Sequence, residues 1–263
     1  MSDPFSTTLP YLKATSSGEH QWCEDTIVTE ERITFYLNGA KILSTMSIPQ
    51  HQDAHLVGFL LSENVIEDID YIQSINIGED GLSVSIQAKI QEENLSNLYC
   101  EKTLTSGCCV GVTGNFEGKI IERFNDSRHQ IPISSIWKAL DYFNNQGTLF
   151  KQTGCVHRAI IFDKKAKALF DVYDIGRHNA LDKVMGLSAL SKVDLRDKFL
   201  FASGRLSLEM IIKAVMHNIP IIISKASTTK LAIQAAQKMG ITLVGFARDH
   251  RCNIYTHHAR ILL

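Results

Sequence analysis

Two adjacent cysteines, Cys108 and Cys109, stand in the glycine-rich stretch TSGCCVG at residues 105–111. A disulfide between chain neighbours is strained, and a tetrahedral metal site needs further ligands. The flanking glycines favour an exposed loop whose backbone N–H groups could face an anionic sulfur. Because the thiolate is the nucleophile in thiol chemistry, the pair indicates an exposed reactive thiol. The alternative is two buried structural cysteines.

Four further stretches carry side chains that could hold an anion, and each follows a predicted strand. They are DIGRHNALDK at 174–183, ASGRLSLEM at 202–210, SKASTTK at 224–230 and FARDHR at 246–251. A helix N-terminus attracts anions, arginine can grip phosphate, and phenylalanine can stack on a base. Ligands of α/β sheets bind outside the carboxyl ends of the strands. Together the stretches predict one nucleotide-like ligand, although each alone is a weak signal and helix capping is the alternative for the three that open a predicted helix.

The composition is that of a soluble globular protein long enough to bury a core. Of 263 residues, 44% are hydrophobic and 21% are charged, and the formal net charge is −1. So small a charge gives no bulk positive field, so we expect neither nucleic acid nor membrane as a partner. The polar N-terminus has no apolar signal segment, and no apolar run approaches the roughly 20 residues that span a bilayer. We therefore expect a cytoplasmic protein whose six cysteines are thiols.

The first half of the chain reads as a small α+β region. Residues 1–24 indicate a loose arm. Asn38 and Gly39 predict a β-hairpin, because a type I′ turn needs positive φ at both positions. Asp53 can cap the helix that follows, and a second hairpin turns at 78–81.

The second half alternates helices and strands. A helix is predicted within 132–147, with a proline near its start and a glycine past its end. A hairpin turning at 164–167 follows, and strands and helices then alternate to the C-terminus, which is typical of βαβ units. The prediction is an α/β fold, with a sheet sandwiched by helices at 131–263 and the smaller α+β region at 1–130.

Several sharp motifs are absent from the sequence. No G-x-G-x-x-G follows a predicted strand. Gly118 and Lys119 precede isoleucine instead of serine or threonine, which excludes a P-loop. There is no C-x-x-C pair, which excludes a zinc ribbon or a thioredoxin-type motif.

The segments that carry the anion-binding residues also resemble a known family. TGCVHRAIIFD, DIGRHNALDKVMG, ASGRLSLEMIIKA, IPIIISKAS and GITLVGFARDHRCNIYTH together resemble the FdhD family of formate dehydrogenase accessory proteins, which are sulfurtransferases. The segment LNGAKILSTMSIPQHQDAHLVGFLLSENVI is similar to the family's opening. The resemblance covers nearly the whole chain from about residue 26.

The resemblance implies a function and a fold. Such proteins accept sulfur from a cysteine desulfurase as a cysteine persulfide. They pass it to the molybdenum (or tungsten) bis-molybdopterin guanine dinucleotide cofactor before that cofactor enters formate dehydrogenase. The family's C-terminal domain is similar to cytidine deaminase, a three-layer α/β/α sandwich, which agrees with the alternation read above. A homodimer fits as well, because a two-armed cofactor could be shared across a two-fold axis.

The resemblance also implies site residues. Family members carry either a C-G-x-C-G pattern or a single cysteine in S-G-C-G, and Ser106-Gly107-Cys108 matches the second form. We therefore expect Cys108 to carry the persulfide, with Cys109 as the alternative carrier or a resolving thiol. The family's cofactor-binding stretch matches Phe246, Ala247, Arg248, Asp249, His250 and Arg251. Further phosphate or guanine contacts are expected from Arg177, His178, Arg205 and Ser224.

Two rival functions are weighed against the sulfurtransferase. A zinc deaminase needs H-x-E and P-C-x-x-C, but His157 is followed by arginine and alanine, so we expect no zinc and no deamination. His157 is equally well explained as a core histidine or a ligand contact. A non-catalytic chaperone that only holds the cofactor would fit the anion-binding loops equally well. It would tolerate Cys108→Ser, whereas a sulfurtransferase would not.

Overall fold

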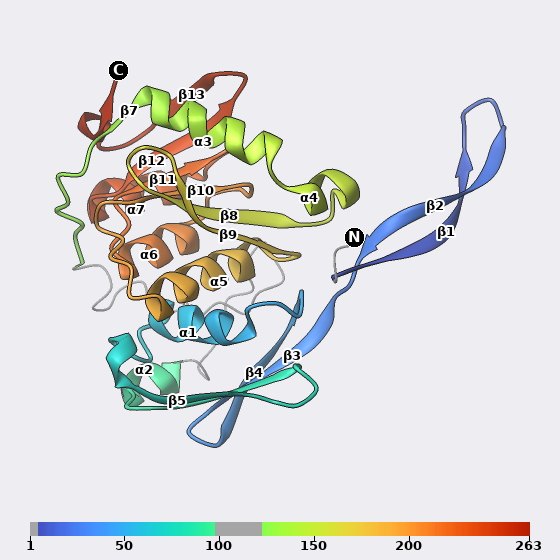
Figure 1. Ribbon diagram of the computed structural model, residues 1–263. Coiled ribbons are helices and arrows are strands. Elements are labelled where there is room, and N and C mark those ends of the chain that lie inside the picture. Colours follow the sequence, from blue (N-terminus) through green and yellow to red (C-terminus); the bar gives the residue numbers. More distant parts are fainter. Residues whose placement is uncertain (1–4, 98–122) are drawn as a thin grey trace.

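The computed structural model describes residues 5–97 and 123–263 (Figure 1). Cys108 and Cys109 lie outside the described residues. The largest sheet has six strands in the order β13-β12-β11-β10-β8-β9. In chain order these strands are β8 (His157–Phe162), β9 (Ala168–Asp174), β10 (Phe199–Ala202), β11 (Ile221–Ser224), β12 (Thr242–Arg248) and β13 (Arg251–Ile254).

Helices cover both faces of this sheet. β10 and β11 are parallel and buried along their whole length, as continuous apolar strands are when both faces are covered. One core contains side chains of α5 (Arg177–Leu190), α6 (Leu208–Met216) and α7 (Lys230–Met239), and the other contains those of α3 (Ile133–Asn145). Figure 1 shows α3 on one side of the sheet and α5 and α6 on the other. The predicted α/β fold is confirmed as a mixed α/β structure.

The N-terminal part forms a second sheet of four strands in the order β4-β3-β6-β5. The predicted hairpin is confirmed, since Asn38 and Gly39 have φ angles of 49° and 83°. The helix prediction is correct, but its N-cap is His51 instead of Asp53, which lies in the first turn. The elements are β3 (Glu31–Leu37), β4 (Ala40–Ser47), α1 (Gln52–Ser62), β5 (Ile72–Ile77), β6 (Ser83–Ala88) and α2 (Glu92–Asn97).

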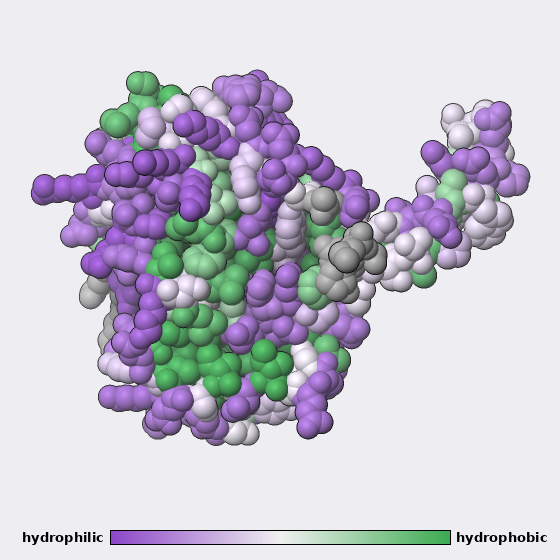
Figure 2. Space-filling view, in the orientation of Figure 1, coloured by the Kyte–Doolittle hydropathy of each residue, from purple (hydrophilic) through white to green (hydrophobic). Residues whose placement is uncertain are grey.

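The prediction of a loose N-terminal arm is wrong for the described residues. β1 (Ser6–Ala14) and β2 (His20–Val28) pair in register as an antiparallel hairpin. The far end of the hairpin stands clear of the body, whereas its base, at Val28, packs against Leu149 and Val156 (Figures 1 and 2). Its strands carry polar and apolar residues on both faces, so the alternation that marks a half-buried strand is missing. The hairpin is held by backbone pairing between β1 and β2, which the pattern of polar and apolar residues does not show.

Two short strands and one short helix complete the part of the chain around the six-stranded sheet. β7 (Ile131–Pro132) pairs with β14 (Ile261–Leu262), near the C-terminus. The helix α4 (Thr148–Thr153) follows α3 and was not predicted. It is too short to show helical periodicity. The proposed boundary at residue 130 stays a prediction.

The helices α1 and α5 join the two sheets at very close range. A Cβ atom added to Gly58 of α1 would lie 1.9 Å from the carbonyl oxygen of Asp182. One added to Gly186 of α5 would lie 1.8 Å from the carbonyl oxygen of Ala54. Both glycines therefore let two helix backbones touch where any side chain would separate them.

A buried ion pair lies beside this helix contact. The side chains of Asp174 and Lys183 are fully buried, and the Lys183 Nζ donates to the Asp174 Oδ2 at 2.7 Å. Ser47 and the backbone N–H of Ile48 donate to the same oxygen from the N-terminal part. Burial by itself would raise the pKa of Asp174, but Lys183 and these hydrogen bonds hold it below its usual value. The pair thus ties β9 and α5 to the end of β4.

A second buried ion pair uses the residue of α5 that precedes Lys183. Lys213 of α6 donates to both carboxylate oxygens of Asp182, at 2.7 and 2.9 Å. Ser62 of α1 donates to the same carboxylate at 3.0 Å. Much of the polar density in GRHNALDK is therefore explained by contacts between helices and between the two parts of the chain.

Buried His55 makes stability depend on pH. It is 3% exposed and lies edge-on to Phe35. Burial, assisted by Lys183, lowers its pKa to about 3. An unfolded histidine has a pKa of about 6.5, so between these values the unfolded state binds the extra proton. Stability is therefore fully present above about pH 6.5 and falls as the pH drops towards about 3.

The variant His55→Gln tests this dependence. Between pH 7 and pH 5 the wild type is expected to lose about 2 kcal/mol more unfolding free energy than the variant. Urea unfolding of both proteins at the two pH values measures the difference. Equal losses would show that His55 does not stay neutral in the fold.

Among the described residues, no helix is long and apolar enough to cross a membrane.

Candidate functional site

The ends of four strands meet at one edge of the six-stranded sheet. β10, β11 and β12 are mutually parallel. β8 is antiparallel to both β9 and β10, so β9 runs in the same direction as those three strands. All four predicted anion-binding stretches therefore follow carboxyl ends at the same edge, where ligands of α/β sheets bind. This part of the sequence prediction is confirmed.

Hydrogen bonds join these loops into one continuous surface. The Ser224 hydroxyl donates to the Gly204 carbonyl at 2.7 Å. Leu206 N–H donates to the Ser227 carbonyl at 3.0 Å, and Phe246 N–H donates to the Ala226 carbonyl at 3.0 Å. The loops after β10, β11 and β12 therefore hold one another in place.

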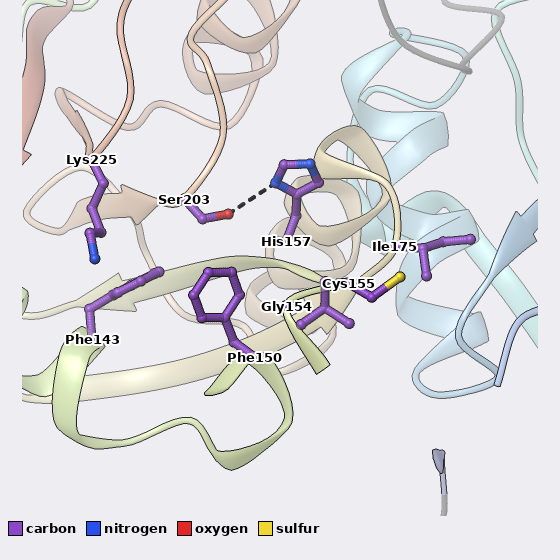
Figure 3. A pocket seen from close by; sticks show the side chains of 9 residues that line it. Phe143, Phe150, Gly154, Cys155, His157, Ile175, Ser203 and Lys225 are labelled. Atoms are coloured by element: carbon purple, nitrogen blue, oxygen red, sulfur yellow. Dashed lines mark hydrogen bonds between the residues drawn. The ribbon is translucent and has the colours of Figure 1, made fainter. Parts of the chain in front are cut away.

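A pocket of about 300 Å³ opens at this edge, a volume at the lower end of what small-ligand sites need. The rings of Phe143 and Phe150 face His157 and Ser203 across it (Figure 3). The remaining lining residues are Gly154, Cys155, Val156, Ile175 and Lys225. The pocket thus combines aromatic and aliphatic walls with a few polar groups, which is the usual make-up of a ligand site.

Arg158 fixes the aromatic wall of the pocket. Its guanidinium is 2% exposed and donates to the Phe143 carbonyl at 2.8 Å. Its Nε donates to Asp171 at 2.7 Å, and an ion pair joins the same two side chains. The C-terminal end of α3 is therefore anchored to β8 and β9, which positions Phe143.

Two of the predicted contact residues begin α5. The side chain of Arg177 lies against the loop after β10, because a Cβ on Gly204 would come within 3.0 Å of it. His178 is 4% exposed, and its Nδ1 lies 3.1 Å from the Glu209 carboxylate. Burial, Lys213 and Arg177 lower the pKa of His178 to about 3. Arg177 is therefore half-buried against that loop, whereas His178 is neutral and packs against Glu209 of α6.

The predicted contacts of Arg205 and Ser224 differ in exposure. Arg205 is exposed beside the pocket and is close enough to His157 to affect its charge. Ser224 is fully buried, and its hydroxyl both donates to Gly204 and accepts from the Ala226 N–H. Ser224 shapes the loop, and its direct contact with a ligand stays a prediction.

The stretch 246–251 is a strained turn between β12 and β13. Phe246, Asp249 and His250 all have φ between 52° and 53°, which costs energy for residues other than glycine. Such strain at a strand end is common where a backbone is held ready for a ligand. The Arg248 guanidinium lies 5.4 Å from the centre of the Phe246 ring, and both side chains are at least partly open to solvent.

The other residues of the stretch 246–251 differ in burial and in contacts. Ala247 is fully buried in the core under α3, so only its backbone could meet a ligand. His250 lies 5.7 Å from the Trp137 ring and 3.9 Å from Asp141, both on α3. Asp249 and Arg251 are exposed. The turn therefore offers its arginines and the Phe246 ring to solvent.

The pocket itself could not be predicted from the sequence. Phe143 and Phe150 were not considered, Lys225 was only part of the predicted stretch 224–230, and His157 was left open. The first two come from α3 and α4, which reach the edge from outside the strand-end pattern. The sequence predicted α3 from its flanking proline and glycine, but it did not indicate that the C-terminal end of this helix faces the site.

Within the described ranges, no group of three or more histidine, cysteine, aspartate or glutamate residues could hold a metal ion. The absence of zinc stays a prediction for the chain as a whole.

Comparison with known proteins identifies the family. The model of the FdhD/NarQ family matches residues 28–262. The sulfur carrier protein FdhD of Wolinella succinogenes is 52% identical over 239 residues, which cover 90% of this chain and 83% of that protein. FdhD of Bacillus subtilis is 36% identical over 93% of both chains.

A solved structure shares the fold. A crystal structure from Desulfotalea psychrophila, described as that of a putative formate dehydrogenase accessory protein, matches with a TM-score of 0.81 and 25% identity. The match covers 98% of this chain and 100% of the other. The family resemblance seen in the sequence is confirmed, and the chain belongs to the FdhD/NarQ family.

Proposed function

We propose that this protein is a sulfur carrier for formate dehydrogenase maturation. The names of its relatives in Wolinella succinogenes and Bacillus subtilis support this role. In the proposed reaction a cysteine desulfurase donates the sulfur. The Cys108 thiolate attacks the outer sulfur of the donor persulfide, a new S–S bond forms, and the donor cysteine leaves as a thiolate. Cys109 is the alternative carrier.

The acceptor in this proposal is the molybdenum (or tungsten) bis-molybdopterin guanine dinucleotide cofactor. The observation that carries the proposal is the meeting of four strand-end loops beside one pocket. Arg177, Arg205 and Arg248 supply cations that suit pyrophosphate. The aromatic walls suit a planar ring. The described residues thus include cations for the phosphates of a nucleotide and aromatic surface for its base.

The domain relation to cytidine deaminase, the cellular location and the oligomeric state are also proposed. Helices on both faces of the sheet support the relation to cytidine deaminase that the family resemblance implies. Cytoplasmic location and a homodimer that shares the two-armed cofactor also remain proposals.

A cofactor-holding chaperone is the alternative, and the Cys108→Ser variant separates the two. In cells that lack their own family member, wild type is expected to restore formate dehydrogenase activity. Cys108→Ser is expected to lower it by about a hundredfold or more, because serine cannot form a persulfide. Cys23→Ser, which removes a thiol on the N-terminal hairpin and away from the pocket, is the matched control and is expected to stay active. Full activity of both Cys108→Ser and Cys109→Ser would favour the chaperone.

A further inference from the structure

His157 is a polar residue of the pocket with one ring nitrogen bonded to the protein and the other without a described partner. It begins β8 and lines the pocket with Ser203 (Figure 3). Its Nδ1 lies 3.1 Å from the Ser203 Oγ. Within the described part of the chain, its other nitrogen, Nε2, has no hydrogen-bond partner and is not buried.

The Ser203 hydroxyl decides which nitrogen carries the proton. Its Oγ accepts the backbone N–H of Arg158 at 2.9 Å. The hydroxyl proton then needs an acceptor, and among the described residues Nδ1 of His157 is the one within reach. If Nδ1 donated instead, no described protein group would accept the hydroxyl proton. The tautomer with its proton on Nε2 is the one in which the protein satisfies both the Ser203 hydroxyl proton and Nδ1.

The surrounding charges keep this ring neutral. Burial together with Arg177 and Arg205 lowers the pKa of His157. Asp174, the opposing charge, is already engaged by Lys183. At neutral pH the pocket therefore presents an uncharged N–H donor in a fixed direction.

The walls indicate the shape of the group that meets this donor. Phe143 and Phe150 provide aromatic surface opposite His157, and Val156 and Ile175 close the pocket with aliphatic carbon. A flat ring fits such walls. A fixed N–H donor selects a ring that carries an acceptor, such as an oxo group, over one that carries an amino group at the same place.

We propose that His157, oriented by Ser203, is a specificity-determining residue that donates its Nε2–H to an oxo-substituted heteroaromatic ring. The 2-amino-4-oxopyrimidine edge common to guanine and pterin has this chemistry. This assignment of the ring rests on the proposed function. Ser203 is a positioning residue that acts through His157.

The test compares GDP, ADP and free pterin by calorimetry and by protection of a pocket thiol. Cys155 is exposed and lines the pocket, so a bound ring is expected to slow its alkylation, followed by peptide mass spectrometry. Cys23, on the distant hairpin, is the internal control. The wild type is expected to bind GDP about tenfold more tightly than ADP, the worth of one such hydrogen bond. Protection by GDP alone assigns the ring to guanine, and protection by pterin alone assigns it to pterin.

Variants separate recognition from folding. His157→Leu is expected to remove the preference for GDP over ADP, and His157→Gln, which keeps an N–H donor, to restore part of it. His20→Leu, on the exposed hairpin, is the matched control and should change nothing. In the wild type, ¹⁵N NMR is expected to show the His157 proton on Nε2, and Ser203→Ala to show a mixture of tautomers.

Several results would overturn the inference. They are an unchanged GDP preference in folded His157→Leu, a His157 proton on Nδ1, and no protection of Cys155 by either GDP or pterin. Loading of sulfur onto Cys108 by a desulfurase is measured separately. The sulfur-carrier function would therefore survive those results, whereas a failure of loading would count against that function and not against the role of His157.

Discussion

Replacing Gly186 with alanine is expected to lower the free energy of unfolding by about 3 kcal/mol or more. In an ordinary helix this change would stabilise the protein by up to about 1 kcal/mol. Here the new methyl group would sit 1.8 Å from the Ala54 carbonyl oxygen, a backbone atom that cannot rotate away. α1 and α5 would have to separate, which opens the packing between the two parts of the chain. Urea unfolding followed by circular dichroism measures the loss.

Ser191→Ala, at the exposed end of the same helix, is the matched control and should change stability by less than about 0.5 kcal/mol. The Gly58→Ala variant should behave like Gly186→Ala, since its methyl group would meet the Asp182 carbonyl oxygen at 1.9 Å. A Gly186→Ala protein as stable as the wild type would show that the two helices do not touch.

Replacing Asp174 with alanine is expected to destabilise the fold by about 3 to 5 kcal/mol. The change leaves the Lys183 ammonium, which is fully buried, without its carboxylate partner. It also removes the acceptor for Ser47 and for Asn179. Chemical unfolding at neutral pH, where Asp174 is ionised, measures the effect.

The double variant Asp174→Ala/Lys183→Met separates the lost charge partner from the lost volume. Without the buried ammonium it is expected to recover part of the stability that Asp174→Ala loses. Asp194→Ala removes a largely exposed carboxylate and serves as the control, with an expected effect under about 1 kcal/mol. If Asp174→Ala unfolded like the control, Asp174 and Lys183 would not form a buried pair.

Local signals in the sequence predicted most elements of the larger sheet. The apolar runs FLFA and IIIS, separated by amphipathic helices, are buried central strands as expected. Their common direction also placed the anion-binding loops at one edge. Turn chemistry at Asn38 and Gly39 was equally reliable, because positive φ at both positions leaves few alternatives.

Features set by tertiary contact could not be predicted in this way. Gly58 and Gly186 read as ordinary helix residues, because a sequence does not show which helix will lie against them. Asp182 and Lys183 resembled site residues until their buried partners were known. The pocket wall from Phe143 and Phe150 arises because α3 and α4 approach the sheet edge from outside the strand-end pattern.

Sulfur loading tests the proposed function most directly. Wild type, Cys108→Ser and Cys109→Ser would each be incubated with a cysteine desulfurase and cysteine, and then weighed intact by mass spectrometry. The account predicts a mass gain of about one sulfur atom that a reductant removes, present in wild type and Cys109→Ser and lost in Cys108→Ser. Loss only in Cys109→Ser would move the carrier to the neighbouring residue. No gain in the wild type, under conditions where the same desulfurase loads another family member, would contradict the sulfur-carrier function.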